Sequence, residues 1–405
     1  MMTSLTLPEN VGLSTTRLNN IPPHLNRYVD DGKIPGYAVF VARRGKPAFY
    51  HQYGLANVET GKSVEDDTIF RIYSMTKPIT SVALMMLYEQ GLFQLDNPVS
   101  KFIPEFKDQT VFASGDANTY QTVLVEREMT IRDLLTHTSG LTYDFGSDHP
   151  VSLMYATAGS QVRDASLADM VKMLGRFPLL FSPGTRWNYS FATDVVGYLV
   201  EVISGQSLDE YFARHIFAPL GMQDTAFVVS PDKASRFAAC YDYDENGFVL
   251  GDDPQDSVYL AQPVRLSGGG GLTSTVTDYF RFSQMLLNKG ELDGKRILGR
   301  KTVELMTSNH LPNNGDLTSM GQAVFSETPY DGIGFGLGFS VMLNPAAANI
   351  LGSPGEFAWG GMASTAFWVD PVEEMIVIFM TQLRPSSSYP IRRELRVLTY
   401  QAIVD

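Results

Sequence analysis

The chain has 405 residues, and its 31 Lys and Arg against 44 Asp and Glu give a formal net charge of −13 at pH 7. Nucleic-acid backbones and anionic lipid surfaces attract Lys and Arg, so this acidic balance argues against both kinds of partner. With 44% hydrophobic and only 19% charged residues, the chain is not a disordered one. The single cysteine, Cys240, excludes an internal disulfide and a cysteine-based zinc cluster.

The sequence shows no sign of a targeting or membrane-spanning segment. Its first residues, MMTSLTLPEN, contain neither a basic n-region nor an apolar h-region. The longest apolar stretches, such as residues 375–380, fall far short of the roughly 18 residues that cross a bilayer. We therefore expect a soluble, cytoplasmic protein without a membrane partner.

The first part of the chain predicts a helix, a hairpin and a second helix. Residues 13–31 have a helical pattern, with two prolines interrupting it near the start. The pattern then changes to strands at 36–42 and 48–53, joined by a turn at 43–46. A second helix is predicted over 74–91.

The middle of the chain predicts mostly helices and long loops. Helical patterns cover 166–174 and 193–203, and Ser207–Glu210 has the spacing of a capping box. The pair Asn246-Gly247 indicates a hairpin. The acidic stretch 240–259 is interpreted as a solvated loop that borders the entrance of a site, since long loops in compact domains often do.

The last part of the chain returns to strands and ends on a helix. A helix is predicted over 277–287, strands over 334–343, 363–369 and 375–381, and a final helix over 391–404. Strands and helices do not alternate as in a parallel, doubly wound sheet. The pattern predicts an α+β fold, with an antiparallel sheet built from both ends of the chain and flanked by N- and C-terminal helices.

This organisation predicts two structural units. Residues 1–95 and 263–405 would form an α/β domain that contains the antiparallel sheet. Residues 96–262 would form a mostly helical domain inserted between them.

A Ser-x-x-Lys element, Ser74-Met75-Thr76-Lys77, opens the second helix. Residues i and i+3 share a helix face, so the hydroxyl and the amine would lie side by side. Pro78 fits the first turn, where a helix needs no N–H donor. A neutral Lys77 would accept the Ser74 proton, and the Ser74 N–H would face an oxyanion. Such an element also occurs by chance on surface helices, with the lysine paired to a carboxylate, but the apolar run that follows predicts a buried helix.

Two further segments have residues suited to the same chemistry. Tyr189 follows a turn and lies on a predicted loop, where a phenol beside an ammonium can move protons; the alternative is an ordinary packed tyrosine. Trp359-Gly360-Gly361-Met362 precedes a strand, and paired glycines let backbone approach a ligand closely. An edge beside Ser74 would supply a second oxyanion N–H, and the alternative is a β-bulge.

Together these residues resemble the serine β-lactamase and penicillin-binding-protein superfamily, and in particular the family VIII carboxylesterases, which are similar to class C β-lactamases. Ser74 to Lys77 looks like the superfamily's Ser-x-x-Lys motif, Tyr189-Ser190 like its tyrosine motif, and Trp359-Gly360-Gly361 like the tryptophan version of its β3-strand motif. The stretches at 91–99, 134–141 and 268–274 are also similar. The resemblance spans nearly the whole chain and implies a β-lactamase/transpeptidase-like fold.

Two departures from the lactam-cleaving members bear on the substrate. Their tyrosine motif usually ends in asparagine, where this chain has Phe191, and their strand motif has a lysine where this chain has Trp359. That lysine helps to bind the carboxylate of the lactam, a charge that tryptophan cannot supply. Both differences favour a neutral ester.

The resemblance implies a serine carboxylesterase that hydrolyses small, short-acyl-chain esters through an acyl-enzyme, without a metal or cofactor. The alternatives are a β-lactamase, a D-amino-acid peptidase or an acyltransferase on the same scaffold, or a non-catalytic acyl-binding or sensor module. The implied roles are: Ser74 as nucleophile, Lys77 and Tyr189 as bases, Ser74 and Met362 as the oxyanion hole, and Trp359, Gly360, Gly361 and Phe191 as substrate-binding residues.

Overall fold

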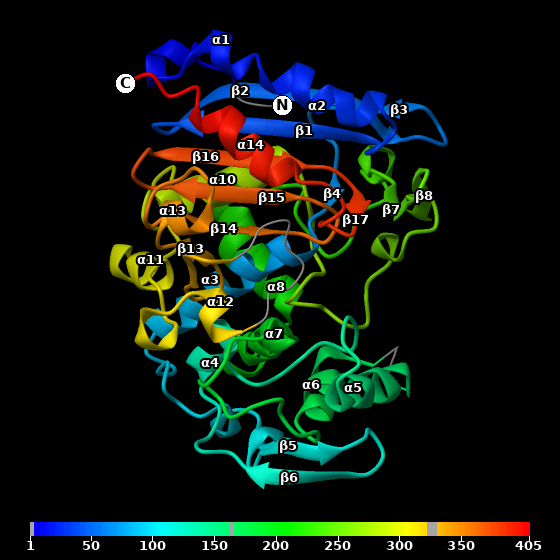
Figure 1. The fold of residues 1–405 in the computed structure, drawn as a ribbon, viewed down its shortest axis with the longest axis vertical. Helices are drawn as coiled ribbons and strands as arrows, with labels where there is room; N and C mark the ends of the chain where they lie inside the picture. The colour runs from blue at the N-terminus through cyan, green and yellow to red at the C-terminus, as the bar shows by residue number, and fades with distance from the viewer. Residues whose placement is uncertain (1–3, 162–164, 322–329) are drawn as a thin grey trace.

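The central element of the fold is an antiparallel sheet of eight strands, in a computed structural model that describes residues 4–161, 165–321 and 330–405 (Figure 1). The strand order is β12-β13-β14-β15-β16-β1-β2-β3, and the paired strands run antiparallel. The strands are β1 (Gly36–Arg43), β2 (Lys46–Asn57), β3 (Lys62–Ser63), β12 (Ile333–Phe335), β13 (Ser340–Met342), β14 (Phe357–Gly360), β15 (Ala366–Asp370) and β16 (Met375–Met380).

The sheet joins the two ends of the chain, because β1 pairs with β16. The α+β class and the antiparallel sheet predicted from the sequence are thereby confirmed. The β1–β2 hairpin turns at Arg44 and Gly45, which both have positive φ, as a two-residue type I′ turn requires. The division into two domains stays a prediction.

Each face of the sheet packs on a different set of helices, as the alternation of side chains along β1 shows. Tyr37, Val39 and Val41 belong to the cluster that includes residues of α2 (Ile21–Asp30) and α14 (Ile391–Tyr400). The intervening residues of β1 belong to the main core, with α3 (Thr76–Glu89) and α10 (Val276–Leu287). This two-residue period buries both faces of the strand.

Two predicted elements are split in the structure. The predicted helix 13–31 is two helices, α1 (Thr15–Leu18) and α2, and the prolines stand in the first turn of α2, where a missing N–H costs nothing. The predicted strand 334–343 is the pair β12 and β13. The chain reverses between them at Gly338, whose φ is +94° and where a Cβ would lie 2.1 Å from Ser81 Oγ on α3.

The capping box predicted at Ser207–Glu210 is wrong. Helix α8 (Leu208–Phe212) does begin there, but the Ser207 hydroxyl donates to Asp209 Oδ1 at 2.6 Å and makes no capping bond to the backbone. This charge-assisted hydrogen bond fixes the orientation of the Ser207 side chain, and in that orientation its oxygen accepts no backbone N–H of the first turn.

The remaining elements surround the sheet or extend from it, and the β5–β6 hairpin projects farthest from the sheet in Figure 1. The helices are α4 (Ile131–Leu135), α5 (Pro150–Gln161), α6 (Leu167–Leu174), α7 (Ala192–Ser204), α9 (Ala218–Leu220), α11 (Arg300–Met306), α12 (Leu317–Met320) and α13 (Pro345–Ala348). The strands are β4 (Phe70–Arg71), β5 (Thr110–Gly115), β6 (Tyr120–Leu124), β7 (Cys240–Asp244), β8 (Gly247–Asp252), β9 (Thr273–Ser274), β10 (Glu291–Leu292), β11 (Lys295–Arg296) and β17 (Leu383–Arg384). In the described part of the chain, no helix is both long and apolar enough to cross a membrane.

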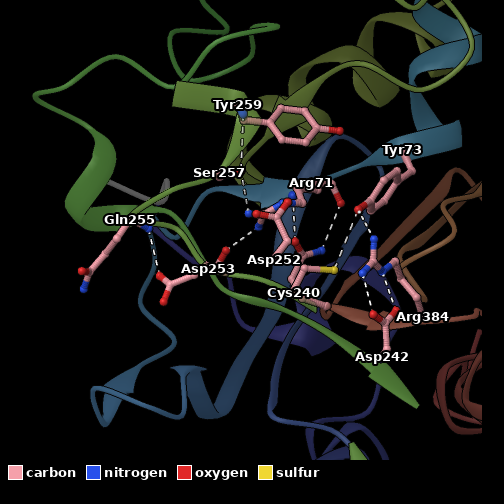
Figure 2. Close-up of polar contacts among 12 residues, drawn as sticks. Arg71, Tyr73, Cys240, Asp242, Asp252, Asp253, Gln255, Ser257, Tyr259 and Arg384 are labelled. Carbon is pink, nitrogen blue, oxygen red and sulfur yellow. Dashed lines mark hydrogen bonds and ion pairs between the residues drawn. The ribbon is translucent and has the colours of Figure 1, made fainter. Parts of the chain in front are cut away.

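The acidic stretch 240–259 forms the predicted hairpin, β7 and β8, but it is not simply a solvated loop. Asp252 lies 2.8 Å from the Arg71 Nε, and Asp242 accepts two hydrogen bonds of 2.8 Å from Arg384 (Figure 2). The Arg71 side chain is fully buried and donates to Ala238 O at 2.5 Å. Asp252 therefore compensates the buried Arg71, and Asp242 pairs with the partly exposed Arg384.

We expect Arg71→Ala to lower the free energy of unfolding by about 3–5 kcal/mol, because removing one partner of a buried pair leaves the other uncompensated. Urea titration measures the change. Arg300→Ala is the control: Arg300 is exposed and pairs with Glu304 on the surface, so its loss should cost less than about 1 kcal/mol. Equal losses for the two variants would contradict the structural role of Arg71.

Candidate active site

The structure places Ser74 in a short 3₁₀ turn, Tyr73–Met75, that leads directly into α3. Pro78 stands in the first turn of α3, as the sequence predicts. Lys77 reaches back along the helix, and its Nζ donates to Ser74 Oγ at 3.1 Å. The i, i+3 spacing thus brings the hydroxyl and the amine together.

The amino group of Lys77 is buried, with only 2% of the residue exposed. Its second acceptor is the carbonyl of Gly269, at 2.6 Å. Among residues 4–161, 165–321 and 330–405, no carboxylate forms an ion pair with Lys77. Lys77 is therefore not the surface lysine paired to a carboxylate that the alternative interpretation of the motif expected.

Tyr189 lies on the loop before α7 and contacts both ends of the site. Its ring centroid is 4.6 Å from Lys77 Nζ. Its hydroxyl accepts a hydrogen bond of 3.2 Å from the indole Nε1 of Trp359. The resemblance implied only a substrate-binding role for Trp359, and no sequence pattern indicated its N–H donation because that bond depends on the approach of two distant segments.

The paired glycines allow the end of β14 to approach the turn that carries Ser74. A Cβ on Gly361 would lie 2.4 Å from the carbonyl oxygen of Ile72, and a Cβ on Gly360 would lie 2.8 Å from the Arg392 guanidinium. Neither gap admits a side chain without a shift in its neighbours. The glycines therefore serve close packing, and Met362, which follows them, is exposed on the wall of the cavity described next.

A cavity of about 370 Å³ opens at Ser74. The predicted residues that line it are Ser74, Tyr189, Phe191, Trp359, Gly360, Gly361 and Met362, while Lys77 lies behind them. Aromatic rings form much of the wall: Tyr143, which the sequence did not single out, packs edge-on against Phe191 with centroids 4.7 Å apart. The arrangement is suited to an apolar ligand next to a reactive hydroxyl.

Arginines of α14, which no motif in the sequence indicated, also line the cavity. Arg396 pairs with the buried Glu356 at 2.6 Å, and Arg392 donates to the carbonyls of Gly361 and Thr365 at 2.9 Å. Arg393 is exposed and donates to a backbone carbonyl of a neighbouring loop. With Trp359 in place of the lysine of the lactam-cleaving members, strand β14 carries no cation at this position, but α14 still provides positive charge to the cavity.

A buried histidine supports the loop of Tyr189. The two ring nitrogens of His137 lie 3.3 Å from Ser190 Oγ and 3.4 Å from Thr193 Oγ1. Burial, together with the charge of Lys77, holds the pKa of His137 well below its usual value. The only signal in the sequence was the stretch 134–141, whose resemblance indicated a familiar segment but no role.

The geometry is that of a Ser-x-x-Lys hydroxyl beside a buried amine and a tyrosine, and the Beta-lactamase family model matches residues 23–401. The chain belongs to the Beta-lactamase family. The resemblance seen in the sequence and the β-lactamase/transpeptidase-like fold are both confirmed. The chain is accordingly an enzyme of the serine β-lactamase-fold group, which comprises hydrolases and acyltransferases.

Known members of the group are similar over nearly their whole length. The esterase EstB of Burkholderia gladioli is 31% identical over 373 residues, which are 86% of this chain and 86% of EstB. The structure of simvastatin synthase (LovD) from Aspergillus terreus has a TM-score of 0.80 and 26% identity, over 95% of this chain and 97% of that one. The structure of EstCE1, a hydrolase with promiscuous acyltransferase activity, has a TM-score of 0.78 and 24% identity, over 95% and 98%.

We expect the stability of the protein to fall as the pH drops through about 6.5, with His137 as one contributor. The unfolded chain takes up a proton on this imidazole near pH 6.5, whereas the folded protein does not until a lower pH, so acid favours unfolding. Urea titrations between pH 7.5 and 5.5 should show a shallower pH dependence for His137→Gln than for wild type. Ser190→Ala removes a hydrogen-bond partner but no titrating group, and should keep the wild-type slope. An unchanged slope in His137→Gln would contradict the expectation.

Proposed function

We propose that this protein is a serine carboxylesterase that hydrolyses small, short-acyl-chain esters. The observation that carries the proposal is the buried Lys77 amine at 3.1 Å from Ser74 Oγ, at the base of a largely aromatic cavity. The similarity to a protein named an esterase, EstB, supports it. The net charge of −13 supports action on a small molecule, without nucleic acid or membrane as a partner.

In this mechanism, Ser74 Oγ attacks the carbonyl carbon of the ester while its proton passes to the Lys77–Tyr189 pair. The N–H groups of Ser74 and Met362 stabilise the oxyanion of the tetrahedral intermediate. The C–O bond to the alcohol breaks, and the alcohol leaves with the proton. Water then attacks the acyl-enzyme, which releases the acid and restores the Ser74 hydroxyl.

The Trp359 N–H supports a role for Tyr189 as proton acceptor. The indole donates to the phenol oxygen at 3.2 Å and so fixes the Tyr189 side chain beside Lys77, whose Nζ lies 4.6 Å from the ring centroid. In the apolar surroundings of the cavity, such a hydrogen bond is electrostatically stronger than in water. The same indole thus forms part of the wall and contacts a reacting group.

A neutral ester is favoured as the substrate because Trp359 replaces a strand lysine and Phe191 replaces an amide. The arginines of α14 favour an anionic substrate instead, because they place positive charge on the cavity wall. A β-lactamase therefore stays an alternative, which the comparison of substrates below distinguishes from an esterase. Arg396 is neutralised by Glu356, so only part of their charge is available to an anionic ligand.

An acyltransferase is the second candidate, and the apolar lining of the cavity favours it. Water attacks the acyl-enzyme in an esterase, whereas an alcohol attacks it in an acyltransferase. An apolar wall binds the alcohol and displaces water, so it favours transfer over hydrolysis. EstCE1, as a hydrolase with promiscuous acyltransferase activity, combines both reactions in one protein. Analysis of products formed with and without an added alcohol distinguishes the two outcomes.

We expect Ser74→Ala to abolish hydrolysis of nitrophenyl esters and labelling by a fluorophosphonate, while it lowers the free energy of unfolding by at most about 1–2 kcal/mol, the value of the one hydrogen bond that its hydroxyl makes with Lys77. Ser81→Ala is the matched control. Ser81 is a buried serine of α3, the helix that follows the turn of Ser74, and its hydroxyl has no hydrogen-bond partner among the described residues, so its loss should preserve labelling. Near-wild-type activity in Ser74→Ala would remove Ser74 as nucleophile, and absence of labelling in the wild-type protein would favour the non-catalytic module.

We expect kcat/KM to be higher for C2–C6 nitrophenyl esters than for a chromogenic cephalosporin. Loss of one charge-assisted hydrogen bond to the lactam carboxylate costs on the order of 1.5–3 kcal/mol, or about ten- to a hundred-and-fifty-fold in rate. If the cephalosporin is cleaved as fast as the esters, the lactamase assignment replaces the esterase one. Arg393→Ala then tests whether α14 supplies the missing charge.

A further inference from the structure

Asp194 is a buried carboxylate on the wall of the cavity that the mechanism above does not use. It lies in the first turn of α7, shortly after Tyr189, and is only 3% exposed. Within the described residues it forms no ion pair with a Lys, Arg or His. Burying an unpaired carboxylate is costly unless its hydrogen bonds compensate, so the donors that bind Asp194 indicate its role.

The donors to Asp194 belong to the glycine segment that holds Lys77. Asp194 Oδ1 accepts hydrogen bonds from Ser267 Oγ at 2.6 Å and from the Gly269 N–H at 3.2 Å. The carbonyl of the same Gly269 accepts the 2.6 Å hydrogen bond from Lys77 Nζ. One peptide segment therefore connects the carboxylate to the amine, and the amine to Ser74.

This segment is held tightly between α3 and α7. A Cβ on Gly269 would lie 2.4 Å from Asp194 Oδ2, and one on Gly268 would lie 2.9 Å from the carbonyl of Thr193. From the other side, the Thr80 hydroxyl donates to the Gly268 carbonyl at 2.7 Å. Four consecutive glycines, 268–271, have high backbone freedom, so their conformation must be fixed by such contacts.

We propose that Asp194 is a positioning residue: by binding Ser267 and the Gly269 N–H, it fixes the Gly269 carbonyl so that Lys77 Nζ stays at Ser74 Oγ. The inference rests on the proposed roles of Ser74 and Lys77, and it does not depend on the ester as substrate. The carboxylate acts through the peptide and does not itself contact the reacting atoms. Its contribution is geometric, and hydrogen bonds to a charged acceptor are the stronger kind for that purpose.

The test compares Asp194→Ala with Asp194→Asn by the rate of fluorophosphonate labelling at Ser74 and by kcat and KM for a nitrophenyl ester. Asparagine retains an oxygen that accepts both bonds, whereas alanine removes the acceptor. We expect alanine to slow labelling and kcat by about 100-fold, the scale of a misplaced catalytic group, with little change in KM. Asparagine should restore both rates to within about tenfold of wild type.

Asp278→Ala is the matched control for loss of a buried aspartate. Asp278 is also buried, at 4% exposed, and accepts a backbone N–H from Asp224 and a hydroxyl from Thr225, but it lies on α10 outside the cavity lining. If Asp194→Ala slows labelling no more than Asp278→Ala does, the positioning role is overturned. It is also overturned if asparagine and alanine are equally slow, because the charge and not the placement would then matter.

A milder variant covers the case in which Asp194→Ala does not fold. Ser267→Ala keeps the carboxylate and the Gly269 bond but removes one of the two donors. We expect labelling to slow about fivefold, the equivalent of one ordinary hydrogen bond; a rate equal to wild type would overturn the proposal. Wild-type protein that is labelled at Ser74 but does not hydrolyse esters would overturn the esterase proposal alone, whereas wild-type protein that is not labelled overturns both.

Discussion

The amino group of Lys77 is withdrawn from solvent at the start of α3, and its hydrogen bonds go to the Gly269 carbonyl and the Ser74 hydroxyl instead of a carboxylate. An amine in such surroundings is costly to bury, and the cost is offset only if its partners are held in place. The surrounding elements meet this need: α3 supplies the lysine, the glycine segment supplies the carbonyl, and α7 supplies the residue that binds that segment. Because Lys77 is not engaged in a salt bridge within the described chain, it remains available to the serine.

The aromatic residues around the amine have two physical effects. Tyr143, Tyr189 and Phe191 exclude water, which strengthens electrostatic interactions within the site. Burial raises the pKa of Tyr143 well above its usual value, with the neighbouring Tyr189 and Asp194 as further causes, so its phenol stays protonated. Both tyrosine rings face the Lys77 amine, and the Tyr189 hydroxyl accepts a hydrogen bond from the Trp359 N–H.

The large sheet makes this arrangement possible by fixing β14 beside the turn of Ser74. Strand β14 is held by β13 on one side and β15 on the other, and its final glycines pass within contact distance of the Ile72 carbonyl. The sheet itself is anchored by the pairing of β1 with β16, which joins the ends of the chain. Backbone at the end of the strand and backbone of the turn thus meet across a gap in which side chains have no room.

The predictions from the sequence were correct where the signal is local. The Ser74–Lys77 contact follows from the i, i+3 geometry of a helix, the β1–β2 hairpin from its turn residues, and the antiparallel sheet from the absence of βαβ alternation. The predictions failed where local patterns compete with nearby partners. The Ser207 hydroxyl binds Asp209 instead of capping its helix, and the glycines near 338 reverse a strand that the apolar pattern alone would have continued.

The sequence by itself located the Ser74–Lys77 pair and Tyr189 and indicated the class of fold, because each depends on residues adjacent in the chain or on a family resemblance. Only the tertiary structure decided which groups surround them. The hydrogen bonds from Lys77 to Gly269 and from Trp359 to Tyr189 join residues 192 and 170 positions apart in the chain. Asp252 pairs with the buried Arg71, although it belongs to an acidic stretch whose composition predicted a solvated loop. Such contacts are set by how helices and strands pack, and no periodicity along the chain encodes the distance between segments that meet only when the core closes.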